Sequence, residues 1–364
     1  MKATMLLEDG TRLEGQAFGA EGTVLGEVVF NTGMTGYQEI LTDPSYAGQV
    51  VTMTYPLVGN YGINGKDMES DRVQVSGFVV KELARVPSHW ECTETLDQYL
   101  KRNNILGMDG VDTRMLTKRI RNKGTMNCIL TTEPLEERHR KMLEAYSFPK
   151  DIVARVSARE TRTYGPPDAP WAVGLVDLGL KRGILEQLLA HSCRVVVFPH
   201  DVQAREIEEA ALDALLFSNG PGDPKDARNA IALAGAFLGK MPVWGICLGH
   251  QIIALALGAD TYKLKFGHRG SNHPVIDMET GNVFISSQNH GYAVDGASVE
   301  ALAATGGPLE GLRVTHWNVN DETVEGLSCP ALGMRCVQFH PEEGPGPHDA
   351  HHIFSHWVGS LGRR

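Results

Sequence analysis

Residues 245–251 read Gly245-Ile246-Cys247-Leu248-Gly249-His250-Gln251, between an apolar run that ends at Trp244 and another that begins at Ile252. This pattern predicts a strand, a sharp turn and a helix, with Cys247 at the apex of the turn. The glycines on either side let the backbone pass close by. A thiol at a helix N-terminus has a lowered pKa, so Cys247 is a candidate nucleophile. The alternative, a buried structural cysteine, is disfavoured because the turn is complete on both sides.

A base for this nucleophile is offered near the C-terminus by His340-Pro341-Glu342. A strand-like run ends at His340, and Pro341, which has no N–H to donate, stops the strand there. Glu342 could hold one imidazole nitrogen so that the other faces the thiol. The chain order of nucleophile, histidine and acid differs from that of the α/β-hydrolases. The tripeptide alone is a weak signal, but together with the turn at Cys247 it predicts a catalytic triad.

A glycine-rich loop follows another predicted strand, at Ser218-Asn219-Gly220-Pro221-Gly222-Asp223. Gly220 and Gly222 would let backbone N–H groups approach a ligand, as an oxyanion hole requires. By itself the loop could be an ordinary tight turn, but three such elements in this order argue against that interpretation. Together the three elements resemble those of the class I (triad) glutamine amidotransferases.

The second half of the chain alternates apolar strands with helices. Strands are predicted at 172–177, 194–198 and 214–217, and helices at 181–190, 207–211 and 227–239. The alternation predicts an α/β fold with a mostly parallel sheet flanked by helices. The resemblance implies that this fold is flavodoxin-like. Ligand sites in such sheets lie at the carboxyl ends of the strands, so Gly220, Cys247 and His340 are expected to converge.

The first half is rich in strand and turn signals, which predict a β-rich α+β domain. Strands are predicted at 13–19, 26–31, 49–55 and 73–80, and helices at 95–100 and 112–121. Periodicity is lost at 157–170, where proline and charged residues accumulate. We therefore predict an N-terminal domain at 1–156, a linker at 157–170 and an amidotransferase domain at 171–364.

Essentially the whole chain resembles the small subunits of carbamoyl-phosphate synthetase. The motifs that carry this resemblance lie at 31–39, 42–49, 55–62, 110–114, 265–274 and 345–350. They are more specific than the turn at Cys247 alone. From the residues themselves, the N-terminal motifs indicate only ordered, turn-rich, polar segments, so their functional meaning comes from the resemblance.

The resemblance implies a chemistry for L-glutamine as substrate. Cys247 would attack the side-chain amide, and water aided by His340 would hydrolyse the thioester. Glu342 would orient His340, while the N–H groups of Gly220 and Leu248 would hold the oxyanion. Further family positions that recognise glutamine match Ser45, Gly222, Gln251, Asn289, Gly291 and Tyr292.

Several of these positions carry a qualification. Ser45 would come from the first domain, and without the resemblance it is a plain Asp-Pro-Ser turn. Residues 286–292 are predicted to form a turn at a strand end. Tyr292 stands where relatives often carry Phe, which keeps the ring. Phe339 stands before His340 where relatives often carry Gly, which could narrow the approach to the base.

The resemblance also implies a partner, because the chain has no Gly-x-x-x-x-Gly-Lys-Ser/Thr loop to bind ATP. Ammonia would pass through an internal tunnel to a large subunit, which would join it to bicarbonate and ATP as carbamoyl phosphate for arginine or pyrimidine biosynthesis, or both. That subunit would use ATP and Mg²⁺, with K⁺ as a further candidate ion, and this chain would hold no cofactor. The two chains would form a heterodimer, with higher oligomers left open.

Composition excludes several classes of protein. A chain of 364 residues suggests two domains. Its net charge of −10 without a basic tract gives nucleic-acid binding little support. The six cysteines form no C-x-x-C pair. No apolar run reaches the roughly 18 residues of a transmembrane helix, and the N-terminus lacks a signal-peptide pattern. A cytoplasmic protein that binds no membrane is expected.

A histidine-rich segment near the C-terminus, with His348, His351, His352 and His356, has spacings that could chelate a metal ion. We prefer a solvated helix face, because no cysteine and no cluster of carboxylates completes a normal site. No metal site is therefore predicted.

Three other functions compete with an ammonia-donating glutaminase subunit. A stand-alone thiol hydrolase of γ-glutamyl compounds would use the same turn and base, although the N-terminal domain argues against it. The module could also serve another synthase, because many synthases use it. A non-catalytic regulatory subunit is disfavoured by the intact Cys247, His340 and Glu342.

Overall fold

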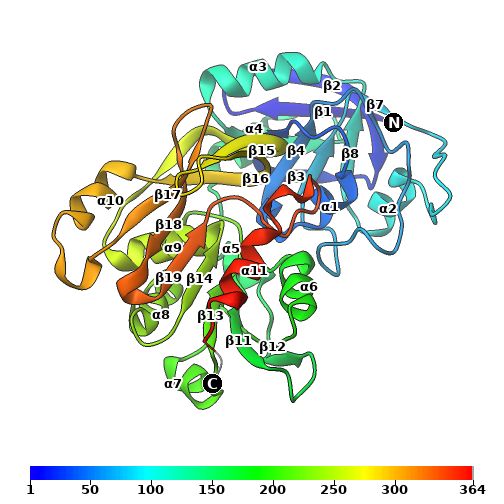
Figure 1. The fold of residues 1–364 in the computed structure, drawn as a ribbon. Helices are drawn as coiled ribbons and strands as arrows, with labels where there is room; N and C mark the ends of the chain where they lie inside the picture. Colours follow the sequence, from blue (N-terminus) through cyan, green and yellow to red (C-terminus); the bar gives the residue numbers. More distant parts are fainter. Residues whose placement is uncertain (363–364) are drawn as a thin grey trace. The chain divides into compact units, whose positions relative to one another are not determined.

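The computed structural model describes residues 1–362, and Figure 1 shows the course of the chain. The chain divides into two compact units, Met1–Pro149 and Lys150–Arg364. The division falls before the predicted linker at 157–170, because residues 162–164 of that segment form a strand that pairs within the second unit. That residues 157–170 form the linker between the two predicted domains stays a prediction. Within the described residues, no helix has both the length and the apolar character needed to cross a membrane.

The first unit is built around a closed barrel with the strand order β1-β2-β8-β6-β4-β3-β9. Closure leaves no unpaired strand edge. The strands are β1 (Lys2–Leu7), β2 (Arg12–Gly19), β3 (Thr23–Asn31), β4 (Gln49–Met53), β6 (Gly77–Val79), β8 (Leu106–Asp109) and β9 (Met126–Thr131). A separate parallel pair is formed by β5 (Leu57–Val58) and β7 (Glu82–Leu83).

The first unit contains five short helical segments. They are α1 (Tyr37–Thr42), η1 (Pro44–Tyr46), α2 (Leu96–Arg102), α3 (Thr113–Lys123) and α4 (Glu137–Ala145). Thr95 and Gln98 form a capping box at the start of α2. Asp112 caps α3 by accepting the N–H of Met115, and α3 ends at Gly124, whose φ is 102°. The β-rich α+β unit and both predicted helices are therefore confirmed.

The second unit contains a ten-stranded sheet with the order β10-β12-β11-β13-β14-β19-β18-β17-β15-β16. Its strands are β10 (Arg162–Tyr164), β11 (Trp171–Val176), β12 (Cys193–Phe198), β13 (Ala214–Phe217), β14 (Val243–Ile246), β15 (Thr261–Asp277), β16 (Val283–Val294), β17 (Arg313–Asn318), β18 (Val324–Cys329) and β19 (Met334–Val337). Strands β12, β11, β13, β14 and β19 are parallel neighbours. The remaining strands extend the sheet in antiparallel fashion.

Helices cover both faces of the parallel part, as the near-continuous apolar strands predict. The helices are α5 (Ile152–Val156), α6 (Arg182–Ala190), α7 (Ala204–Glu209), η2 (Pro224–Asp226), α8 (Arg228–Phe237), α9 (Leu248–Leu257), α10 (Gly296–Ala303), η3 (Gly307–Leu309), η4 (Pro330–Leu332), η5 (His348–Ala350) and α11 (His352–Gly359). One core packs α8 and α9 on the sheet, and the other packs α6 and α11. In the second core, Trp244 stacks on Trp357 with ring centroids 5.6 Å apart.

Strand order explains how distant sequence motifs meet. β13, β14 and β19 are consecutive parallel neighbours, with Phe217 opposite Gly245 and Ile246 opposite Val337. The loops that follow these strands begin at Ser218, Cys247 and Gln338, so they lie together at one edge of the sheet. The predicted convergence at the carboxyl ends of the strands is confirmed.

One local prediction is wrong. Residues 286–292 do not form a turn at a strand end but lie inside β16, which pairs with β15 along most of its length. The pairing shifts register between Lys263 and His268 and between Gly270 and His273. Such irregularities change the direction in which side chains point within a strand. The polar residues and glycines in this part of β16 resemble those of a turn when only the sequence is considered.

Candidate active site

Cys247 lies at a strained turn between β14 and α9. Its φ is 55° and its ψ is −104°, values that a residue with a side chain rarely adopts. The N–H of Cys247 donates to the carbonyl oxygen of Val337 at 2.9 Å, which ties the turn to β19. The predicted strand–turn–helix is confirmed, with the cysteine at its apex.

The two flanking glycines allow this turn for a steric reason. A Cβ atom on Gly249 would lie 2.1 Å from the carbonyl oxygen of Phe217, and one on Gly245 would lie 2.6 Å from the carbonyl carbon of Gly249. Both contacts are with backbone atoms, which cannot rotate away. The glycines therefore let β13, β14 and the first turn of α9 approach one another.

His340 and Glu342 form a buried pair beside this turn. Nδ1 of His340 lies 2.6 Å from Oε1 of Glu342. The backbone N–H of His340 donates to the carbonyl oxygen of Ser287 at 3.0 Å, which fixes the segment after β19 against β16. Because Nδ1 faces the carboxylate, Nε2 is the nitrogen left for other groups, and it has no hydrogen-bond partner among the described residues.

Lys181 joins the pair as a third charged group, which the sequence did not indicate. Its Nζ lies 2.8 Å from Oε1 of Glu342, and both side chains are buried. The backbone N–H of Lys181 donates to Oδ1 of Asn219, in the loop after β13. A lysine just before α6 ordinarily reads as a surface residue. The available signal was its place after β11, whose carboxyl end lies at the same edge of the sheet.

The charges of this cluster stabilise one another. Burial would raise the pKa of Glu342, but the Lys181 ammonium and the His340 imidazole lower that pKa to about 2. Burial also opposes a charge on His340, yet the Glu342 carboxylate raises the pKa of His340 to about 10. Cys247 contributes to the same rise, which places its thiol near the imidazole. Near neutral pH the cluster therefore holds an ammonium, a carboxylate and an imidazolium.

Gly220 and Leu248 lie against each other beside the thiol. A Cβ atom on Gly220 would lie 2.8 Å from Cδ2 of Leu248 and 2.2 Å from the carbonyl oxygen of Leu178, so only glycine fits there. Leu248 is the first residue of α9, and a first helical N–H has no partner within its helix. Neither of these two N–H groups donates to an acceptor in the part of the chain that the structure describes. They are thus available to a developing negative charge.

Asn289 and Tyr292 reach the site through their backbone. Sγ of Cys247 lies 3.6 Å from the carbonyl oxygen of Asn289. Nε2 of Gln251 donates to the carbonyl oxygen of Tyr292 and to Oε1 of Gln338, both at 2.8 Å. In this geometry Gln251 braces β16 against the segment that leads to His340.

The remaining predicted positions are distributed as follows. Gly291 follows Asn289 in β16, and a Cβ atom there would lie 3.3 Å from the guanidinium of Arg269. Gly222 adopts a φ of 95° in the loop after β13. Ser45 belongs to the first unit, where it lies buried in η1 and donates its N–H to Oδ1 of Asp43 at 2.8 Å. The role of Ser45 in glutamine binding stays a prediction.

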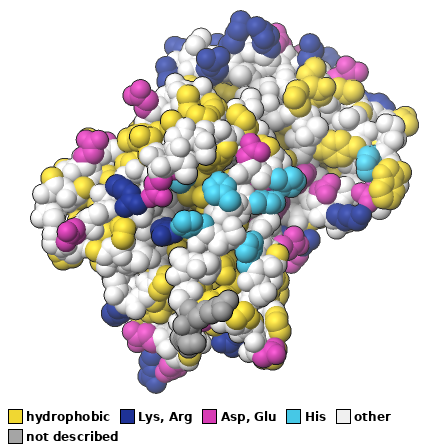
Figure 2. Space-filling model, viewed as in Figure 1, with side chains coloured by type: hydrophobic (Ala, Val, Ile, Leu, Met, Phe, Trp, Pro, Cys, Tyr) yellow, Lys and Arg dark blue, Asp and Glu magenta, His cyan; other side chains and the backbone are white. Residues whose placement is uncertain are grey.

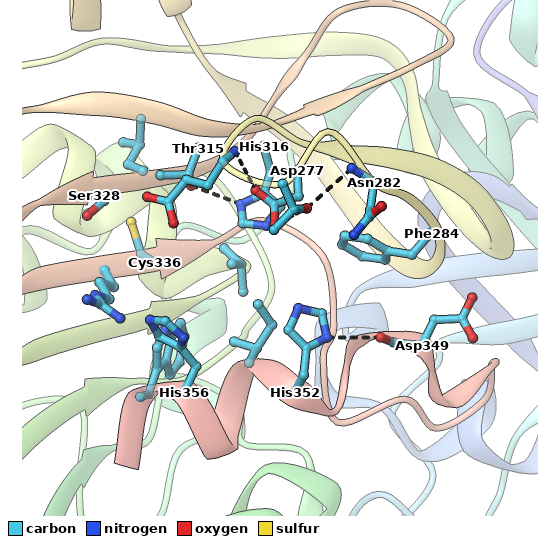
Figure 3. Close-up of a pocket in the computed structure, with 17 residues that line it drawn as sticks. Asp277, Asn282, Phe284, Thr315, His316, Ser328, Cys336, Asp349, His352 and His356 are labelled. Atoms are coloured by element: carbon cyan, nitrogen blue, oxygen red, sulfur yellow. Dashed lines mark hydrogen bonds between the residues drawn. The ribbon is translucent and has the colours of Figure 1, made fainter. Parts of the chain in front are cut away.

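Phe339 points into the core of the second unit. Its buried ring contacts Phe284 and His316, with centroids 5.3 and 5.5 Å away. Phe284 and His316 also line a cavity of about 450 Å³ between β15–β19 and α11, shown in Figure 3. Cys247, His340 and Glu342 are not among the residues that line this cavity, so it is separate from the candidate active site. Phe339 thus anchors the backbone of His340 from the core.

Comparison with known proteins gives concordant matches in both halves of the chain. Residues 5–130 match the family model described as the CPSase domain of the carbamoyl-phosphate synthase small chain. Residues 174–359 match the model of class I glutamine amidotransferases.

Similar curated proteins align over almost their full length. The carbamoyl phosphate synthase pyrimidine-specific small chain of Bacillus subtilis is 48% identical, over 98% of this chain and 95% of its own. The carbamoyl phosphate synthase small chain of Bacillus caldolyticus is 50% identical, over 99% and 97%. That of Archaeoglobus fulgidus is 49% identical, over 99% of both chains.

Proposed function

Because this chain belongs to the family of carbamoyl-phosphate synthase small chains, we propose that it hydrolyses L-glutamine and supplies the ammonia to a large synthase subunit. The observation that carries the proposal is the arrangement of Cys247, His340 and Glu342. A strained cysteine stands at a helix N-terminus, and beside it a buried histidine is held by a carboxylate that is itself paired with Lys181. This arrangement fits nucleophilic attack on an amide.

The first half of the reaction forms a thioester. With the His340 imidazolium beside it, Cys247 attacks as a thiolate at the amide carbon of glutamine, and the carbonyl π electrons move to oxygen. The N–H groups of Gly220 and Leu248 stabilise that oxyanion. His340 gives its proton to the amide nitrogen, the C–N bond breaks and ammonia leaves. The product is a γ-glutamyl thioester beside a neutral imidazole.

The second half releases glutamate. Neutral His340 takes a proton from water, and the resulting hydroxide attacks the thioester carbon. The second tetrahedral intermediate collapses, and the C–S bond breaks with its electrons on sulfur. The thiolate and the imidazolium are thereby restored. Glu342 and Lys181 undergo no covalent change: Glu342 keeps Nδ1 of His340 oriented, and Lys181 keeps Glu342 ionised.

The thioester can be tested directly. Acid quenching of the protein during turnover of glutamine, followed by mass spectrometry of the intact chain, is expected to show a γ-glutamyl adduct on the wild type. The Cys247→Ala variant should carry none. A wild type that turns over glutamine but carries no adduct at Cys247 at any quench time would refute this mechanism.

We further propose that the ammonia serves carbamoyl phosphate synthesis. The large subunit would use bicarbonate, ATP and Mg²⁺, and the product would enter arginine or pyrimidine biosynthesis. The small chain of Bacillus subtilis is named pyrimidine-specific, which favours the second pathway. Co-expression with the large subunit from the same genome should give a stable complex whose carbamoyl phosphate synthesis depends on glutamine. A complex that forms but uses only free ammonia would contradict the proposal.

A further inference from the structure

The turn that follows Glu342 brings a carboxylate and two imidazoles together. Oε2 of Glu343 lies 2.9 Å from Nδ1 of His348 and 3.0 Å from Nε2 of His351. The two histidine nitrogens lie 3.3 Å apart. All three atoms come from a segment of nine residues between the candidate triad and α11. The proposed glutaminase mechanism does not use any of them.

These separations match the demands of a tetrahedral metal ion. Zinc binds histidine nitrogens and carboxylate oxygens at about 2.0–2.2 Å, so its ligand atoms lie roughly 3.3 Å from one another. Two histidines and one glutamate are also a known ligand set for zinc. The spacing of these histidines could chelate a metal ion, but the segment alone did not predict a site, because the completing carboxylate of Glu343 lies just outside it in sequence.

Glu343 is held in place before any ion binds. Its Oε1 accepts the backbone N–H of Ala350 at 2.7 Å, which leaves Oε2 directed at the two imidazoles. The residue adopts a φ of 59°, an uncommon conformation that turns the side chain inward. The side chain is 1% exposed, and its ion-pair partners among the described residues are His348 and His351.

The surroundings leave room for a fourth ligand. His348 is 81% exposed, so a water molecule can reach the open side of the three ligand atoms. The amide of Gln187, on α6, lies 3.4 Å from Nε2 of His351. Rotation of that amide would present its oxygen instead of its nitrogen. Figure 2 shows histidine side chains gathered over the C-terminal segment that contains α11.

A second group of potential ligands, His268, His290 and Glu325, is less suitable. Nδ1 of His268 lies 3.7 Å from Oε1 of Glu325. The two carboxylate oxygens of Glu325 already accept amide hydrogens, from Gln288 at 2.9 Å and from Asn318 at 3.2 Å. This group is better described as a buried polar network.

We propose that Glu343, His348 and His351 bind one divalent transition-metal ion, of the Zn²⁺ class, with water or Gln187 as a fourth ligand. The bound ion would link the turn after Glu342 to the start of α11. It would therefore stabilise the segment that carries the candidate base without taking part in the chemistry.

Cobalt is the probe of choice, because Co²⁺ replaces Zn²⁺ and its visible absorption reports four-coordinate geometry. The titration is best made on the full chain with the Cys247→Ala substitution, which removes the candidate nucleophile as a competing ligand. One Co²⁺ per chain with four-coordinate bands is expected, and Zn²⁺ should displace it. Zn²⁺ should also raise the Tm by a few °C at saturating concentration.

Three further substitutions in that background locate the ion. Glu343→Gln and His348→Ala should each weaken binding at least about tenfold, because each removes one of three protein ligands. His356→Ala, on the exposed face of α11, should bind as the parent does. The metal-free Tm of each variant shows whether it is folded. The proposal would be overturned if the parent bound no Co²⁺ or if Glu343→Gln and His348→Ala bound it as tightly as the parent. It would also be overturned if His356→Ala lost as much affinity as those two variants.

Discussion

The Lys181 ammonium lies 2.8 Å from the Glu342 carboxylate, and the two side chains are only 2% and 0% exposed. Glu342 holds Nδ1 of His340 with the same oxygen atom. The chain thus extends the triad by one cation. Without Lys181, His340 would be the one remaining cation to balance the buried carboxylate of Glu342.

Lys181→Met should destabilise the second unit strongly. Removal of one partner of a buried ion pair typically costs about 3–5 kcal/mol, because the other charge stays buried. Urea unfolding of the variant measures this loss. The matched control is Lys225→Met, which removes an exposed ion pair with Asp260 and should cost no more than about 1 kcal/mol. Equal losses of unfolding free energy in the two variants would show that the buried Lys181–Glu342 pair stabilises the protein no more than an exposed pair does.

Glu342→Gln should change the pH dependence of glutamine hydrolysis. The carboxylate is the main group that raises the pKa of His340 to about 10, whereas burial and Lys181 lower it. With a neutral amide in its place, the pKa of His340 should fall below its ordinary value of 6.5. The proton for the leaving ammonia is then missing near neutral pH, and turnover should drop about 10²–10⁴-fold. A pH–rate profile like that of the wild type would contradict this role.

The charged cluster should also set limits on stability at both ends of the pH scale. The pKa of Glu342 is lowered from 4.5 to about 2, so its contribution is complete above pH 4.5 and is lost as the pH falls through 2. The pKa of His340 is raised from 6.5 to about 10, so its contribution is complete below pH 6.5 and is lost as the pH rises through 10.

Free energies of unfolding for the wild type and His340→Gln, measured across this range, test the alkaline limit. The difference between the two proteins should be greatest below pH 6.5 and should shrink toward pH 10. A difference that does not change with pH would mean that His340 titrates in the folded protein as it does in the unfolded chain.

Gly249→Ala should disable the turn at Cys247. The added Cβ would lie 2.1 Å from the carbonyl oxygen of Phe217, so β13 and α9 must move apart. A displacement of about 1 Å near a reacting group can reduce turnover about 100-fold. Gly235→Ala is the matched control, at an exposed position in the last turn of α8, where the new Cβ meets nothing within 4 Å. It should leave turnover unchanged and stabilise α8 by up to about 1 kcal/mol. Full turnover by Gly249→Ala would contradict the steric argument.

The sequence predicted the features that depend on local pattern. The turn at Cys247 needs small residues at fixed offsets, and the structure shows the backbone contacts that exclude a side chain at Gly245 and Gly249. The parallel core was predictable for a similar reason, because strands buried on both faces are apolar along their length.

Features that depend on long-range pairing escaped prediction. Lys181 and Glu342 are 161 positions apart, and nothing near Lys181 in the sequence distinguishes it from a surface lysine. The antiparallel hairpin of β15 and β16 contains bulges and polar residues, so the sequence of residues 286–292, inside β16, resembles a turn. Closure of the first unit into a barrel likewise depends on pairing between β1 and β9, which lie at opposite ends of that unit.

The role of Cys247 as the nucleophile is best tested by measuring ammonia release from glutamine for the wild type and for Cys247→Ala, with and without the large subunit. We expect release that the large subunit stimulates and that disappears in Cys247→Ala under both conditions. Release by Cys247→Ala at the wild-type rate would contradict it. Release by the wild type that the large subunit leaves unchanged would instead indicate a free-standing hydrolase.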